Sequence, residues 1–155
     1  MSTLKVNKII PTAGVPTGGG GGVIQTIYAS TASEVSTNSS SFVDTGLSGS
    51  ITPTASTSKV LIMADLASCL KDGDTYFAVQ VLRGSTVIGK IDESATYTNS
   101  NTYASAGSIS CHILDTPGAG THTYKLQFRS VSGSYNCKVQ TNSSLSTMIL
   151  QEISA

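Results

Sequence analysis

The alternation of hydrophobic and polar residues predicts that most of this chain forms β-strands. Residues 121–131 show the pattern most clearly, because Tyr124, Leu126 and Phe128 occupy alternate positions with polar or charged residues between them. Side chains alternate between the two faces of a strand, so this segment has one apolar and one polar face. A one-residue shift in its pairing would bury Lys125 and Arg129, and the register is therefore strongly specified. Other segments bounded by Gly, Pro and Ser predict strands at residues 23–29, 42–45 with its continuation 47–52, 59–70, 75–83, 86–92, 108–115, 135–141 and 146–153.

Residues 59–70 differ from the other predicted strands because they are apolar on both alternating faces. A strand of this kind is normally covered on both sides. We expect one cover to be the core of the domain, and the other to be a further layer or a neighbouring subunit.

The number and spacing of the predicted strands indicate the fold class. No window combines a 3.6-residue apolar period with helix caps and helix-forming residues. Eight or nine short strands joined by Gly, Pro and Ser turns are typical of a sandwich or barrel. We therefore predict an all-β fold, an antiparallel jelly-roll-like β-sandwich over residues 23–155, preceded by an extended N-terminal arm.

Residues 1–22 are predicted to be that arm, with a Gly-rich joint at its end. Pro11 and Pro16 exclude a helix interior, and the glycines at 18–22 lose much entropy when they are ordered. The arm nevertheless carries more large apolar residues than a solvated tail requires, and we expect it to dock on another surface through Leu4, Val6, Ile9 and Ile10. The alternative is a loose tail, which is common at chain ends.

Composition and charge narrow the function classes. Nine Lys and Arg balance nine Asp and Glu, so the chain lacks the basic surplus that nucleic-acid binding requires. Its apolar runs are shorter than the roughly 18 residues of a membrane span, and no membrane insertion is expected. The first residues lack the apolar stretch of a secretory signal, which predicts retention in a cytosol until lysis.

The odd number of cysteines argues against a disulfide framework, and we expect three buried core thiols at Cys69, Cys111 and Cys137.

Neither a catalytic nor a metal-binding constellation can be recognised in the sequence. Cys111 and His112 are neighbours on a predicted strand and face opposite ways, and the paired short spacings of zinc ligands are absent. There is no Gly-x-Ser-x-Gly nucleophile motif, and Asp72 and Asp74 fit an ordinary turn better than a calcium loop. We therefore expect no enzymatic activity, no cofactor and no metal. The remaining carboxylates considered for a glycoside hydrolase pair are too dispersed to nominate one, namely Asp44, Asp65, Asp92, Glu93, Asp115 and Glu152.

The polar segment 93–106 is the best candidate for a ligand contact. It is predicted to be a long loop that holds two tyrosines among amides and hydroxyls. Aromatic rings stack on the apolar faces of sugars, while amides and hydroxyls bind sugar hydroxyls. The alternative is a solvated loop whose tyrosines pack onto the core. The expected glycan contacts are Tyr97, Asn99, Asn101 and Tyr103, and Tyr135 with Asn136 form a second such pair.

Several stretches of the chain resemble small virion proteins of tailed bacteriophages, especially phages of marine cyanobacteria. In the arm these are STLKVNKIIP at residues 2–11 and GVPTGGGGGVIQ at residues 14–25. In the body they are SFVDTGL at 41–47, ITP at 51–53, SKVLI at 58–62, VLRGSTVIG at 81–89 and HTYKLQF at 122–128. The resemblance covers nearly the whole chain, and its motifs are structural rather than catalytic.

The resemblance implies a non-enzymatic structural protein that is assembled in the host cytoplasm and resides in the virion. In such proteins an N-terminal arm attaches to the particle, and a C-terminal β-domain, commonly a homotrimer, faces outward. Other virion proteins are then the expected partners of residues 1–22, and a host surface polysaccharide is a further candidate partner. The long shaft of usual fibres is missing here, which leaves a short tail fibre, a head fibre, a capsid decoration protein and a host-glycan-binding module as alternatives. The anchor residues are expected to be Leu4, Val6, Asn7, Ile9, Ile10 and Pro11.

Overall fold

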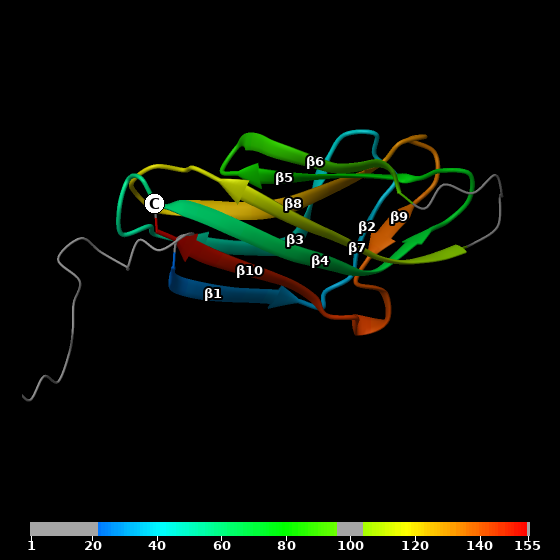
Figure 1. Ribbon diagram of the computed structural model, residues 1–155. Helices are drawn as coiled ribbons and strands as arrows, with labels where there is room; N and C mark the ends of the chain where they lie inside the picture. Colours follow the sequence, from blue (N-terminus) through cyan, green and yellow to red (C-terminus); the bar gives the residue numbers. More distant parts are fainter. Residues whose placement is uncertain (1–21, 96–103, 155) are drawn as a thin grey trace, which may run out of the picture.

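A computed structural model describes residues 22–95 and 104–154, which form strands along most of their length (Figure 1). A short 3-10 turn, η1 (Thr141–Ser143), precedes the last strand. Within these two segments no helix has the length and apolar character needed to cross a bilayer. The strands are β1 (Val23–Thr31), β2 (Val35–Thr37), β3 (Val43–Ile51), β4 (Lys59–Lys71), β5 (Phe77–Arg83), β6 (Thr86–Ala95), β7 (Ala104–Asp115), β8 (His122–Ser130), β9 (Cys137–Val139) and β10 (Ser146–Ile153).

The eight longest strands pair as one long antiparallel hairpin that is rolled up. β5 pairs with β6, β4 with β7, β3 with β8 and β1 with β10, and each pair encloses the previous one along the chain. Pairing of β10 with β4 and of β8 with β5 gathers these strands into two sheets. Sheet A contains β1-β10-β4-β7, extended at one end by β9 and β2, and sheet B contains β3-β8-β5-β6. This nested pairing is that of a jelly roll, so the predicted all-β sandwich is confirmed.

The first and last described residues lie at the same end of the sandwich, which we call the proximal end (Figure 1). Gly22 N donates to Ser154 Oγ at 3.1 Å, and Ser154 N donates to Gly22 O at 3.0 Å. The turns at 52–58, 84–85 and 116–121 lie at this end as well. The opposite, distal end holds the connections 32–42, 72–76 and 131–145, together with the strand ends at Ala95 and Ala104.

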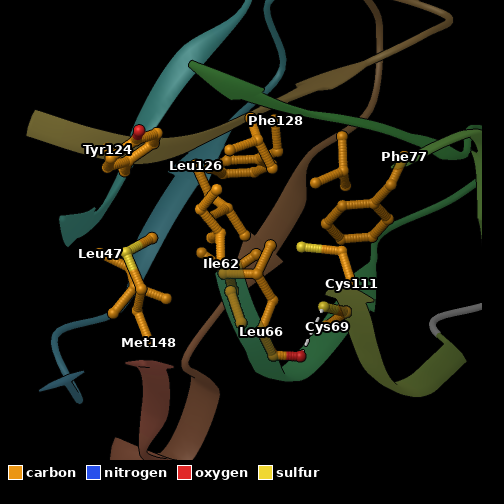
Figure 2. Packing of buried hydrophobic residues seen from close by; sticks show 14 of the residues in the cluster. Leu47, Ile62, Leu66, Cys69, Phe77, Cys111, Tyr124, Leu126, Phe128 and Met148 are labelled. Atoms are coloured by element: carbon orange, nitrogen blue, oxygen red, sulfur yellow. Dashed lines mark hydrogen bonds between the residues drawn. The ribbon is translucent and has the colours of Figure 1, made fainter. Parts of the chain in front are cut away.

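The core fills the space between the inward faces of the two sheets (Figure 2). Phe77 of β5 and Phe128 of β8 stack there with ring centroids 5.9 Å apart. The predicted inward face of β8 is confirmed, because Tyr124, Leu126 and Phe128 are exposed by no more than 1%. Alternation along β4 places every second side chain in the same core from the opposite sheet, namely Val60, Ile62, Ala64 and Leu66.

Three segments differ from the sequence prediction. β2 lies in the Ser/Thr-rich stretch 30–41, which the sequence predicts as a connection, and it forms because Val35 and its neighbours pair with the distant β9. The predicted loop 93–106 is shorter, since β6 continues to Ala95 and β7 begins at Ala104. The predicted strand 135–141 contracts to β9 (Cys137–Val139), because Gln140 adopts a left-handed backbone with φ 57°.

Candidate functional surfaces

The residues that the sequence nominates for attachment lie outside the described residues, and so do the first four glycan candidates, whereas the second glycan pair, Tyr135 and Asn136, is described. The structure nevertheless fixes where their segments join the domain. The chain enters the sandwich at Gly22, at the proximal end, and the segment 96–103 connects Ala95 to Ala104 at the distal end (Figure 1). The two sets therefore join the domain at opposite ends. They are the anchor residues Leu4, Val6, Asn7, Ile9, Ile10 and Pro11, and the glycan candidates Tyr97, Asn99, Asn101 and Tyr103.

A fully buried carboxylate, Glu152 on β10, organises one side of the proximal end. Gln25 Nε2 donates to its Oε2 at 2.6 Å. The backbone N–H and the hydroxyl of Thr54 donate to its Oε1 at 2.8 and 2.7 Å. Burial alone raises the pKa of this carboxyl, but hydrogen bonds from Gln25, Ser58 and Thr54 outweigh that effect and lower its pKa to about 2. The charge of Glu152 is therefore satisfied by hydrogen bonds. We call Glu152 with Gln25, Thr54 and Ser58 the Glu152 cluster, and it holds the turn 52–58 in place.

A second polar cluster at the proximal end links the two sheets. Arg83 Nη1 at the end of β5 lies 2.6 Å from Asp115 Oδ2 at the end of β7, and the hydroxyl of Tyr124 on β8 donates to the same oxygen at 2.8 Å. Burial of the ring, reinforced by the hydrogen bond to Asp115, raises the pKa of the Tyr124 hydroxyl. Because β7 belongs to sheet A and the other two strands to sheet B, this cluster joins the sheets.

At the distal end, the predicted pair Tyr135 and Asn136 packs against the turn that follows β4. Asn136 O accepts a hydrogen bond from Asp72 N at 2.8 Å. Gly73 has φ +105°, and any side chain at this position would collide with the ring of Tyr135. Tyr135 is still 41% exposed, so one part of the ring fixes the turn and another part faces solvent.

The same end contains a group of non-glycine residues with left-handed backbone angles. These residues are Ser68, Gln140, Asn142 and Ser143, with φ between 48° and 57°. The Ser68 and Thr141 hydroxyls hydrogen-bond to each other, and Gln140 Nε2 donates to Ser146 Oγ at 3.0 Å. Such conformations cost energy and persist where surrounding contacts hold them. They explain why β9 is short and why β4 has an irregular register after Leu66.

The cysteine and histidine side chains are spread over four strands, β4, β7, β8 and β9. The three cysteines are free and buried, as predicted, and burial raises the pKa of Cys69 to about 12 and of Cys137 to about 11. His112 is exposed whereas Cys111 is buried, so the two face opposite ways as expected. Among residues 22–95 and 104–154, no three His, Cys, Asp or Glu side chains come together in a way that could hold a metal ion.

The outward face of sheet B carries a chain of hydrogen-bonded polar side chains across three strands. Asp44 on β3 accepts from Lys125 Nζ at 2.9 Å and from Gln127 Nε2 at 2.7 Å, and Gln80 Nε2 on β5 donates to Gln127 Oε1 at 2.9 Å. Desolvation raises the pKa of Asp44, but the bonds from Lys125 and Gln127 outweigh it and the net pKa is lowered. These four polar side chains thus form hydrogen bonds with one another.

Sequence reasoning missed the roles of Glu152 and Asp115, which it considered only as dispersed carboxylates. Their partners are far away in sequence, with Thr54 separated from Glu152 by 98 residues and Arg83 from Asp115 by 32. No local motif identifies such clusters. Knowledge of the nested strand pairing would have identified them, because this pairing places the ends of β4, β5, β7 and β10 together.

Comparison with known proteins adds no family to this description. No protein-family model matches the chain, and no curated protein matches it significantly.

Proposed function

We propose that this chain is a non-enzymatic structural protein of a tailed-bacteriophage virion, a short trimeric tail-fibre or appendage protein. Its N-terminal arm anchors it to the particle, and its β-domain faces outward. The observation that carries this proposal is that the two ends of the jelly roll differ in the segments that join them. The arm joins at Gly22 on the proximal end, whereas β6 ends at Ala95, β7 begins at Ala104 and the exposed Tyr135 lies at the distal end.

The construction of the domain supports this role in physical terms. A particle component has to remain folded outside the cell. The proximal end, next to the proposed anchor, is closed by the Glu152 cluster and by the Arg83–Asp115–Tyr124 cluster. Glu152 and Tyr124 are buried in these clusters, whereas Arg83 and Asp115 are partly exposed. Hydrogen-bonded networks around buried polar groups rigidify a structure. The resemblance of residues 2–11 and 14–25 to virion-protein arms supports the assignment of the anchor.

Deletion of residues 2–17 tests the anchor. We expect the shortened chain to fold with the same β-rich circular dichroism as the full chain and to be missing from assembled particles. Leu4→Asp with Ile9→Asp is the point variant expected to have the same effect, and Lys5→Ser with Lys8→Ser is the matched control expected to incorporate normally. Normal incorporation of the deletion variant contradicts the proposal.

Particle imaging with a label on Ala155 separates the locations that the proposal leaves open. We expect the label on the tail, close to the point of attachment, because Ser154 lies beside Gly22 at the proximal end. A label distributed over the head surface identifies the capsid decoration or head-fibre alternative instead.

Binding of a host surface glycan is a second candidate function, favoured by one observation. Two of the exposed large hydrophobic residues, Tyr135 at 41% and Leu145 at 54%, lie at the distal end, where the segment 96–103 joins. We expect Tyr97→Ala with Tyr103→Ala to lower binding of the full chain on a glycan array, whereas Ser48→Ala on sheet B leaves binding unchanged. Equal binding by all three proteins rules this function out.

A further inference from the structure

We propose that the outward face of sheet A binds an uncharged oligosaccharide along two neighbouring rows of side chains. The inference rests on the second candidate function, glycan binding. It adds to that function a site on the described strands, on the flank of the sandwich, and a class of sugar that this site selects.

The first observation is the alignment of the two rows across four strands, β1, β10, β4 and β7, which lie side by side (Figure 1). Strand register forms one row, which we call the Tyr28 row, from Tyr28, Ile149, Met63 and His112. It forms a second, which we call the Asp65 row, from Ser30, Thr147, Asp65 and Ser110. On each strand the two row residues are two positions apart, so both rows face the same side of the sheet.

The second observation is a shallow depression of about 140 Å³ where the two rows meet. Six row residues line it, three from each row, and Tyr28 and Ser30 extend the rows beyond it on the edge strand β1. A cavity of about 150 Å³ accommodates a six-membered ring such as benzene. The depression is therefore large enough to seat one pyranose ring.

The third observation is that the rows offer the two kinds of contact that a sugar makes. Tyr28 is 59% exposed, and Ile149 and Met63 continue from it as an apolar surface into the depression. Such groups cover the apolar C–H face of a sugar ring. In the other row the Asp65 carboxylate lies directly between two hydroxyl residues, Thr147 and Ser110. Carboxylates and hydroxyls form hydrogen bonds with sugar hydroxyls.

The polar groups of this face are available to a ligand, in contrast to those of sheet B. On sheet B the outward polar side chains bond to one another. Four polar residues line the depression on sheet A, and within the part of the chain that the structure describes their side chains form no hydrogen bond with another residue. They are Asp65, Ser110, His112 and Thr147. Their donors and acceptors are therefore left for the hydroxyls of a sugar.

Charge and length define the class of ligand. Asp65 is the single carboxylate of the two rows, and it accepts hydrogen bonds from uncharged sugars but repels the carboxylates of uronic acids. From His112 to Tyr28 the row spans three strand spacings, about 14 Å, which is longer than one sugar ring. We therefore expect a neutral oligosaccharide, with one ring in the depression and a further ring stacked on Tyr28.

An array of tetrasaccharides of glucose, galactose and mannose, together with those of the corresponding uronic acids, tests the class of ligand with the full chain. We expect binding to neutral members only. Calorimetric titration with the neutral tetrasaccharide of strongest signal then tests the site. Tyr28→Ala and Asp65→Asn should each weaken binding about tenfold, with unchanged circular dichroism. The matched controls, Tyr28→Phe and Asp44→Asn on sheet B, should retain the wild-type affinity.

The same measurements separate failure of this site from failure of glycan binding. A wild-type chain that binds no member of the array refutes both. If the wild type binds and either Tyr28→Ala or Asp65→Asn retains its affinity, the two-row site on sheet A is wrong, and glycan binding at the distal end still stands. Stronger binding to the uronic acids than to the neutral sugars overturns the class of ligand and, with it, the role of Asp65.

Discussion

Glu152 of β10 accepts hydrogen bonds from both the backbone N–H and the hydroxyl of Thr54, at 2.8 and 2.7 Å. Thr54 lies in the turn between β3 and β4, where the chain crosses from sheet B to sheet A. One carboxylate therefore ties the last strand to the turn that closes the proximal end. A buried donor that loses its acceptor costs about 1–3 kcal/mol, so this contact is important for stability.

Acid is expected to destabilise the domain through Glu152. Its pKa is about 2 in the folded chain, against an ordinary value of 4.5. A lowered pKa contributes stability that is complete above the unfolded value of about 4.5 and is lost as the pH falls towards 2. The shift corresponds to up to about 3 kcal/mol in the free energy of unfolding. Urea unfolding at a series of pH values between 7 and 3 measures this loss.

Glu152→Gln identifies the source of that pH dependence. The variant is expected to be less stable than the wild type at pH 7 and to show a flatter profile below pH 4.5. Glu34→Gln, which removes an exposed carboxylate of the same size, is the control and should retain the wild-type profile. If Glu152→Gln and the wild type lose stability in parallel, another group carries the effect.

The sequence was sufficient to predict the fold because burial here follows local alternation. Leu126 and Phe128 face the core as their spacing requires, and the Gly84-Ser85 dipeptide joins β5 to β6 as predicted. β2 could not be predicted, because its three residues become a strand only through pairing with β9. Local pattern carries information about faces and turns, but not about partners that are remote in sequence.

The candidate surfaces were less accessible from the sequence for the same reason. Residues 59–70 revealed that β4 has a second apolar face, yet the neighbours that complete that face, Tyr28 and Ile149, are placed there by register. The role of Asp115 likewise depends on Arg83 and Tyr124, which come from other strands. A site assembled from single residues of several strands leaves no spacing motif.

Tyr124→Phe is expected to weaken the link between the sheets. The change removes the hydroxyl that donates to Asp115 at 2.8 Å while keeping the buried ring. Hydrogen bonds to charged groups contribute about 1.5–3 kcal/mol, and we expect a loss in that range by urea unfolding. Tyr135→Phe, in which the ring is 41% exposed, serves as the control with little expected loss. Equal stability of wild type and Tyr124→Phe would show that water replaces the hydroxyl.

The three thiols are expected to be inert in the folded chain. Cys69, Cys111 and Cys137 are buried, and burial raises the pKa of each, to about 12 for Cys69 and about 11 for Cys137. The thiolate is the reactive form, so both access and ionisation oppose reaction. Titration with a disulfide reagent at pH 8 should label no cysteine in native protein and three after unfolding in urea. Rapid labelling of one thiol before unfolding would place that cysteine at the surface.

Gly73→Ala is expected to be among the most disruptive single-methyl changes in the distal end. Gly73 has φ +105°, and a Cβ there collides with the ring of Tyr135, whereas Gly84 has φ +58° with open space around it. Backbone strain alone predicts a loss of about 1–2 kcal/mol for Gly84→Ala. The collision adds about 1–3 kcal/mol for Gly73→Ala. Urea unfolding of Gly73→Ala in the wild type and in Tyr135→Ala forms a double-mutant cycle, in which removal of the ring should recover the added part of the loss. If Gly73→Ala costs no more than Gly84→Ala, the Tyr135 ring moves aside freely and does not fix the turn.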